Sequence, residues 1–382
     1  MIPYGRQHID QQDIDAVVAT LNSDFLTQGP QVPRFEARMS QLCQAKYACA
    51  VSSATAALHL ACLALEVGKG DTVWTSPVTF VASANVALYC QAQIGFVDIN
   101  VEDGLMSVAC LAQKLQLSSK NNTLPKVLIV VHLAGQSCDM VNIHGLCQQY
   151  GVKIVEDASH AIGAQYRQQP VGNGQYSDIC VFSFHPVKIM TTAEGGLALT
   201  NQPALAQKMD LLRSHGVTRD EALFDQPSHG PWYYQQVDLG FNYRITELQA
   251  ALGISQSNKL TDFIAKRNQL ALQYNDMISQ LPIEHLQQSP DNLSAYHLYV
   301  VLTDNEQLQR DRLFAHLREK QILVNVHYIP VHLQPYYQKL GFKTGDFPNA
   351  EQYYQRAITL PLYPDLTVEQ QDYVISSINE LL

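Results

Sequence analysis

The chain is short of positive charge. Its 382 residues include 25 Lys or Arg against 35 Asp or Glu, so the formal net charge at pH 7 is -10. Nucleic acids and anionic membranes bind basic surfaces, and this balance disfavours a general affinity for either. The sequence also lacks an apolar run long enough to span a bilayer, and the N-terminus lacks the apolar core of a signal peptide. We therefore expect a cytoplasmic protein that binds neither nucleic acid nor membrane.

Several motifs of metal, nucleotide and hydrolase sites are also missing. The eight cysteines contain no C-x-x-C pair, and His327 and His332 have no cysteine neighbours, so no metal site is predicted. There is no P-loop and no G-x-S-x-G, and the glycine-containing segment 172–177 lacks the third glycine of a dinucleotide fingerprint. The cysteines are interpreted as reduced core residues.

Apolar strands alternating with helices dominate the first two thirds of the chain. Hydrophobic residues make up 46% of the sequence, which is typical of a globular protein with a sizeable core. Near-continuous Val and Ile runs between helices indicate a mostly parallel sheet with both faces covered. We expect strands over residues 47–53, 72–75, 94–99, 126–132, 152–156, 178–184 and 197–200.

The pattern changes beyond about residue 250. A long helix, interrupted near 255–261, is expected over 246–280 and could link two domains. Strands are then expected over 297–303 and 324–328, and helices over 310–321, 349–358 and 367–382. This α+β order predicts a large domain over 12–250 and a small domain over 251–382, joined by the N-terminal segment 1–11.

Lys188 stands in the stretch S-F-H-P-V-K-I-M-T-T-A-E-G-G, between an apolar strand and Gly195-Gly196. A desolvated lysine has a lowered pKa and can form a Schiff base with a carbonyl cofactor. Most lysines are solvated surface charges, so position alone leaves both interpretations open.

Two further features would give such a lysine a cofactor. Asp157 ends the buried strand V-K-I-V-E-D, at the sheet edge where Ser183 and His185 are also expected. A carboxylate there can keep a pyridine nitrogen protonated, or it can simply cap a helix. The S-S-A-T segment at 52–55 precedes a helix, where backbone N–H groups favour a phosphate, although a plain N-cap explains it equally.

Taken together, these residues resemble the sugar aminotransferases of the DegT/DnrJ/EryC1/StrS family. E-D-A-S-H-A-I-G-A, S-F-H-P-V-K, T-T-A-E-G-G, L-R-S-H-G and D-L-G-F-N-Y-R-I-T-E-L-Q-A-A-L-G occur in the family's order, over essentially the whole chain. Many relatives have glycine where this chain has Ala54. Within the family, Q-x-I-D-x-x-D-I-D at 7–15 and V-x-V-H-Y-x-P at 324–330 are most similar to the pseudaminic-acid branch.

The resemblance implies a fold-type-I enzyme that depends on pyridoxal 5'-phosphate (PLP). Lys188 would bind the cofactor as a Schiff base, Asp157 would pair with its ring nitrogen, and Phe80 would stack on the ring. The remaining implied contacts are the phosphate ligands Ala54, Thr55 and Ser183, the nearby His160 and His185, Asn242 reaching the phosphate from the second subunit of a homodimer, and the substrate positions Thr27, Gln28 and His327.

The resemblance also implies a reaction. The amino group of L-glutamate would pass to the C4 ketone of a UDP-linked 4-keto-6-deoxy-N-acetylhexosamine, on the route to the pseudaminic acid used in flagellin glycosylation. Three alternatives stay open: the same chemistry on a 4-keto-pentose or perosamine-type precursor, the deoxygenating branch of the family, and a non-catalytic regulator. The deoxygenating relatives carry histidine at the lysine position, and a regulator would need a basic face or an added DNA-binding module.

Overall fold

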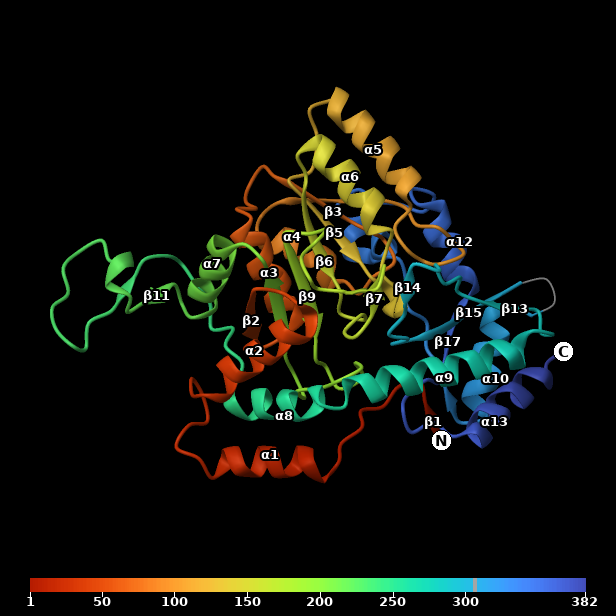
Figure 1. Ribbon diagram of the computed structural model, residues 1–382. Helices are drawn as coiled ribbons and strands as arrows, with labels where there is room; N and C mark the ends of the chain where they lie inside the picture. The colour runs from red at the N-terminus through yellow and green to blue at the C-terminus, as the bar shows by residue number, and fades with distance from the viewer. Residues whose placement is uncertain (305–307) are drawn as a thin grey trace.

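The computed structural model describes residues 1–304 and 308–382. At its centre lies a seven-stranded sheet whose strands are ordered β2-β10-β9-β6-β5-β3-β4 (Figure 1). In that spatial order they are β2 (Tyr47–Val51), β10 (Gly196–Thr200), β9 (Ile179–Ser183), β6 (Lys153–Asp157), β5 (Val127–Val131), β3 (Thr72–Thr75) and β4 (Gln93–Phe96). Only β10 runs against the others, pairing antiparallel with β9 and β2. The predicted α/β fold with a mostly parallel sheet is confirmed.

Helices cover both faces of this sheet, because successive apolar residues of a strand point to opposite faces and each face packs against its own hydrophobic core. Val127 and Ile129 of β5 pack toward one face, whereas Leu128 and Val130 pack toward the other. The first face carries α3 (Ala54–Ala64), α4 (Ala82–Tyr89) and α7 (Pro203–Arg213), and the second carries α2 (Gln31–Cys43), α5 (Val108–Lys120), α6 (Met140–Tyr150) and α8 (Glu247–Ser257). All eight cysteines are free thiols, and seven are buried, as predicted.

The C-terminal part builds a smaller sheet of its own. Three antiparallel strands, ordered β13-β15-β17, pack against helices around one further core. Its elements are α9 (Leu260–Ile278), β13 (Ile283–His285), β15 (Tyr299–Thr303), α10 (Arg310–Glu319), β16 (Ile322–Leu323), α11 (Pro335–Gln338), α12 (Pro348–Arg356), β17 (Ala357–Leu360) and α13 (Val368–Asn379). The domain boundary at residue 250 stays a prediction.

Three expectations for this part are refined or corrected. The helical segment expected over 246–280 forms two helices, α8 and α9, which are separated at Asn258 and Lys259, within the interruption expected over 255–261. The strand expected over 324–328 does not form there: β16 ends at Leu323, and within the expected range only Asn325 makes a bridge, to Thr359. The helix expected over 349–358 ends at Arg356, since the apolar residues after it pair with β15 as β17.

The N-terminal segment crosses from one part of the chain to the other. Strand β1 (Ile2–Pro3) pairs in parallel with β16, and the Tyr4 carbonyl accepts a hydrogen bond from the Leu362 N–H at 3.0 Å. Helix α1 (Gln11–Leu21) then packs against α8. The buried Asp13 carboxylate fixes this contact by accepting bonds from Ser255 Oγ (2.6 Å) and Lys259 Nζ (2.6 Å).

Three smaller features complete the fold. One short sheet is ordered β14-β7-β8, and a two-stranded one joins β11 (Val217–Thr218) to β12 (Gln235–Gln236). The strands of the former are β7 (Gln165–Tyr166), β8 (Gln169–Pro170) and β14 (Asn292–Leu293). The segment between β11 and β12 extends away from the body (Figure 1), and its Trp232 is 71% exposed. Among the described residues, no helix has the length and apolar character needed to cross a membrane.

Candidate active site

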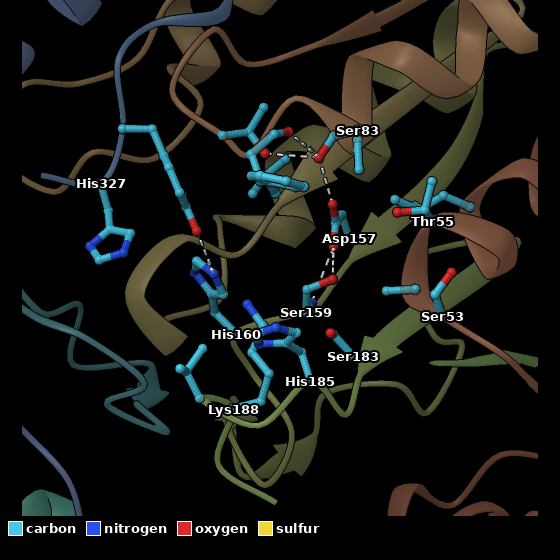
Figure 2. Close-up of a pocket in the computed structure, with 18 of the residues that line it drawn as sticks. Ser53, Thr55, Ser83, Asp157, Ser159, His160, Ser183, His185, Lys188 and His327 are labelled. Carbon is cyan, nitrogen blue, oxygen red and sulfur yellow. Dashed lines mark hydrogen bonds between the residues drawn. The ribbon is translucent and has the colours of Figure 1, made fainter. Parts of the chain in front are cut away.

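A cavity of about 710 Å³ lies at the carboxyl ends of the parallel strands. Val131, Asp157 and Ser183 are the last residues of β5, β6 and β9, and all three line it. The turn between β2 and α3 and the segment between β3 and α4 add further walls. The predicted edge of the sheet is therefore where the structure forms its cavity (Figure 2).

Lys188 lies on the cavity wall, five residues after β9. Its N–H donates to the His185 carbonyl at 2.9 Å, which closes a turn after the strand. Burial lowers the pKa of the Lys188 amine to about 8, although the negative charge of Asp157 acts in the opposite direction. An amine in this state is a nucleophile near neutral pH.

Asp157 is buried and held by three donors. Its carboxylate accepts hydrogen bonds from Ser83 Oγ (2.6 Å), Ser159 Oγ (2.5 Å) and the Ser159 N–H (3.2 Å). Ser83 is itself in contact with Thr79 Oγ1 at 2.8 Å. Because Ser83 donates its proton to Asp157, Thr79 is the donor to Ser83. This chain of hydroxyls fixes the carboxylate beside the cavity (Figure 2).

The turn before α3 offers donors for an anion. Ser53, Ala54 and Thr55 line the cavity at the N-terminus of this helix, where Ser53 accepts from the Ala56 N–H at 3.1 Å. Gly196 of β10 lies against the same turn, and a Cβ there would sit 2.3 Å from the Ser53 backbone. The strand can therefore approach this turn only because residue 196 is a glycine.

Aromatic and imidazole rings line other parts of the cavity. Phe80 lines the cavity and is 60% exposed. Buried His160 accepts from the Ala134 N–H at Nδ1 (3.3 Å), and desolvation and then the charge of Lys188 keep its pKa well below the usual range. Burial likewise lowers the pKa of His327 to about 3, and His185 is exposed on the cavity wall.

The structure brings most of the predicted residues together. Those that line the cavity are Ala54, Thr55, Phe80, Asp157, His160, Ser183, His185, Lys188 and His327. Thr27, Gln28 and Asn242 are exposed and do not line it in the single chain. The predicted roles of these three, including the reach of Asn242 into a second subunit, stay predictions.

Several lining residues were missed. Ser83 and Ser159 hold Asp157, and Tyr4, Glu194 and Tyr328 also face the cavity. Ser159 stands two positions after Asp157, and Tyr328 directly follows His327. Their nearness in sequence to predicted site residues could have identified both. Tyr4 lies more than 180 residues from Lys188 along the chain, and no local pattern points to it.

These groups fit pyridoxal phosphate. A buried amine suits an aldehyde, a carboxylate suits a ring nitrogen, and the helix N-terminus against Gly196 suits a phosphate. In Figure 2 Ser53 and Thr55 lie on one side of Asp157, and His327 lies on the other. Within the part of the chain that the structure describes, no three His, Cys, Asp or Glu side chains group as a metal site.

Comparison with known proteins leads to the same chemistry. The family model described as DegT/DnrJ/EryC1/StrS aminotransferase family matches residues 7–379. The chain is 35% identical over 391 residues to a Campylobacter jejuni protein named UDP-4-amino-4,6-dideoxy-N-acetyl-beta-L-altrosamine transaminase, covering 100% of this chain and 98% of that protein.

Solved structures agree. Helicobacter pylori PseC, described as an aminotransferase involved in the biosynthesis of pseudoaminic acid, superposes with a TM-score of 0.90 at 30% identity, covering 100% of this chain and 98% of that one. A candidate sugar aminotransferase of Streptococcus pneumoniae in its PLP form gives a TM-score of 0.89 at 30% identity, covering 100% and 99%.

The cavity, the family match and the structural superpositions support the same assignment, and the last two extend over nearly the whole chain. The protein is a PLP-dependent nucleotide-sugar aminotransferase and belongs to the DegT/DnrJ/EryC1/StrS aminotransferase family.

Proposed function

We propose that this aminotransferase moves the amino group of L-glutamate to the C4 ketone of a UDP-linked 4-keto-6-deoxy-N-acetylhexosamine, in pseudaminic acid biosynthesis. The observation that most supports this proposal is that the Lys188 amine, with its lowered pKa, and the Asp157 carboxylate line the same cavity. The names of the Campylobacter and Helicobacter relatives support the choice of sugar.

In this proposal seven of the predicted residues divide the contacts with the cofactor. Lys188 holds it through its amine, Asp157 faces its ring nitrogen, and Phe80 packs on its ring. Ala54, Thr55 and Ser183 bind its phosphate, with Asn242 of a second subunit. Bound there, PLP supplies an electron sink for the carbon that carries the amine.

Lys188 also moves protons. Once free of the cofactor, its Nζ removes the proton at the α-carbon of glutamate, and in the second half-reaction it delivers a proton to C4 of the sugar. Desolvation supports this role, because it brings the pKa of the amine to about 8, close to the working pH. Within the cavity walls His160 and His327 stay neutral, since burial lowers the pKa of both rings.

A homodimer is part of the proposal. Asn242 is exposed and outside the cavity of its own chain, so its proposed phosphate contact requires another subunit. The exposed Trp232, Tyr234 and Leu239 near the β11–β12 arm are large apolar side chains that a partner could cover. A mass measurement in solution tests this part separately.

A panel of nucleotide-linked keto sugars tests the substrate. The purified holoenzyme would receive L-glutamate and, in parallel, the UDP-linked 4-keto-N-acetylhexosamine of the altro series, a 4-keto-pentose and a perosamine-type precursor. We expect kcat/KM for the first to exceed the others by about 100-fold or more, because a site built to hydrogen-bond one substrate discriminates against analogues that leave its polar groups unpaired. A preference for the pentose or the perosamine-type sugar would replace the proposed substrate by that one.

A further inference from the structure

His59 is a buried polar residue in an apolar helix. Apart from Thr55, it is the only residue of α3 with a nitrogen or oxygen in its side chain, and it is 6% exposed. Burying an imidazole costs free energy unless a hydrogen bond replaces its lost contact with water. That bond joins His59 Nδ1 and Tyr243 Oη at 3.1 Å, and it can form with either tautomer of the ring. A histidine that does not line the cavity is therefore bonded to the residue next to Asn242.

The backbone around Asn242 is held from two sides. The Tyr243 N–H donates to the Arg213 carbonyl at the end of α7 (3.0 Å), and the Tyr243 carbonyl accepts from the Ser52 N–H (2.8 Å), just before α3. Asn242 itself forms an antiparallel bridge with Ser214. Helices α3 and α7 lie side by side (Figure 1). These bonds fix the path of the backbone, but they do not fix which side chains face outward.

The rings on either side of Asn242 fix that direction. Successive side chains of an extended segment point to opposite faces, so Phe241 and Tyr243 share one face and Asn242 points the other way. The two rings stack with centroids 4.9 Å apart and pack against the hydrophobic core that includes α3. The Phe241 ring also lies 4.9 Å from that of His59. Because His59 holds both rings inward, Asn242 is presented to the outside, where it is exposed.

We propose that His59 is a positioning residue: through its hydrogen bond to Tyr243, it holds Asn242 in the orientation that reaches the phosphate of PLP bound to the second subunit. The inference rests on the proposed function, which assigns that contact to Asn242. His59 therefore acts on the cavity of the other subunit and not on that of its own chain, although α3 begins at its own phosphate turn.

The first test measures PLP binding by variants of the bonded pair. Tyr243→Phe removes one oxygen and keeps the ring, whereas His59→Leu removes the imidazole. One net hydrogen bond corresponds to about 2- to 10-fold, so Kd for PLP, titrated into the cofactor-free protein, should rise by that factor in each variant. Since both changes remove the same bond, the double variant should match His59→Leu within about twofold. Losses that multiply, or a wild-type Kd in Tyr243→Phe, would overturn the proposal.

The matched control is His144→Leu. His144 is a half-buried histidine of α6 whose Nδ1 lies 3.0 Å from the Tyr176 carbonyl, whose ring lies 6.0 Å from that of Tyr176, and which does not line the cavity. Its variant should bind PLP as wild type does. His59→Asn keeps a hydrogen-bonding group near the position of Nδ1 and should recover most of the affinity. Tyr243→Phe keeps the test decisive if melting curves show that His59→Leu is unfolded.

The second test uses mixed dimers, purified through two different tags, to locate the affected cavity. In the first dimer one subunit carries Lys188→Ala and the other carries His59→Leu. Lysine-linked cofactor then forms only in the His59→Leu subunit, whose phosphate is reached by Asn242 of a subunit with an intact His59. We expect a wild-type Kd for PLP, measured from the absorbance band of the lysine-linked cofactor.

In the second dimer one subunit carries both substitutions and the other is wild type. Lysine-linked cofactor forms in the wild-type subunit, but its Asn242 contact comes from the subunit that lacks His59, so Kd should rise about 2- to 10-fold. The reverse pattern would show that His59 acts on its own cavity through α3. Equal losses in both dimers would show a general effect on the fold. Either result overturns the proposal.

The same two dimers with Asn242→Ala in place of His59→Leu test the proposed function separately. A lost hydrogen bond to a charged phosphate should raise Kd about 10- to 100-fold, and only in the second dimer. If Asn242→Ala leaves Kd unchanged or affects the first dimer, or if the protein is a monomer in solution, the shared site of the proposed function is wrong and the role of His59 falls with it. If Asn242→Ala gives the expected pattern and His59→Leu does not, only the role of His59 is wrong.

Discussion

The two sides of the cavity differ in how far the protein satisfies its own polar groups. On one side the Asp157 carboxylate accepts three hydrogen bonds, and the Ser83 behind it is bonded in turn. On the other side the Tyr328 hydroxyl has a single hydrogen-bond partner among the described residues, His160 Nε2 at 3.1 Å. Completed networks suit a resident group, whereas open groups suit a ligand that comes and goes.

The same two sides come from different parts of the chain. Asp157 and Ser183 end strands of the seven-stranded sheet, and Ser83 is on α4 beside it. Tyr4, His327 and Tyr328 come from the N-terminal segment and from the chain after β16. Under the proposed function, the sheet side would carry the chemistry shared by both half-reactions, and the other side would contact the sugar.

The largest effect is expected from Lys188→Ala, on the sheet side. Loss of the amine removes both the cofactor linkage and the proton carrier, so kcat should fall by about 10⁴-fold or more in both half-reactions. The absorbance band of the lysine-linked cofactor should disappear as well. The control is Lys153→Ala, which replaces an exposed lysine paired with Asp178 and should behave as wild type. Turnover at the wild-type rate in Lys188→Ala would remove the residue from the mechanism.

The sheet side was largely predictable from sequence. Near-continuous apolar strands separated by helices specify a parallel sheet, and the carboxyl ends of its strands must meet at one edge. Asp157 and Ser183 could therefore be placed together from the order of strands and helices alone, and pairing of β6 with β9 confirms that edge. The family motifs then pointed to Lys188, which lines the same cavity.

The other side was not predictable, because its contacts join distant segments. Tyr4 reaches the cavity through the pairing of β1 with β16. The segment 1–11 was expected to join the C-terminal part, but no pattern in it specifies the strand with which it pairs. The strand expected over 324–328 was wrong for a related reason. In this run Val324 and Val326 alternate with polar residues, which has strand character, but at Asn325 it makes only a bridge to Thr359, so tertiary contacts decided its shape. Ser83 was missed because a serine in the first turn of a helix has no distinctive pattern.

A smaller effect is expected from Ser83→Ala, which weakens the sheet side without removing it. One of three donors to the Asp157 carboxylate is lost, and a hydrogen bond to a charged group is worth about 1.5–3 kcal/mol, so kcat should fall about 10- to 100-fold. Both half-reactions should slow by the same factor, since both depend on Asp157. Ser377→Ala, a buried serine that bonds the Tyr373 carbonyl, is the control. If only the sugar half-reaction slowed, the sheet side would not serve both half-reactions equally, and the proposed difference between the two sides would be wrong.

The next effect concerns pH and the same lysine. After removal of the cofactor, uptake of added PLP requires the neutral amine of Lys188. Burial lowers its pKa from 10.5 to about 8, so the neutral fraction grows as pH rises through 8. The uptake rate should therefore increase about tenfold between pH 7 and pH 9 and then level off. Stopped-flow absorbance measures this rate. A rate that keeps rising toward pH 10.5 would mean that the amine is solvated.

The smallest effect is expected from Tyr4→Ala, on the other side of the cavity. The Tyr4 ring lies 5.2 Å from that of His327, and both line the cavity. An aromatic contact is worth about 0.5–1.5 kcal/mol, so KM for the keto sugar should rise about 3- to 10-fold. Tyr4→Phe keeps the ring and should lose less. Because Tyr4 lies away from Asp157 and its donors, the glutamate half-reaction should keep its wild-type rate in both variants. Slower glutamate turnover in Tyr4→Ala would mean that the N-terminal segment also supports the cofactor side, and the two sides would then have to be treated as one.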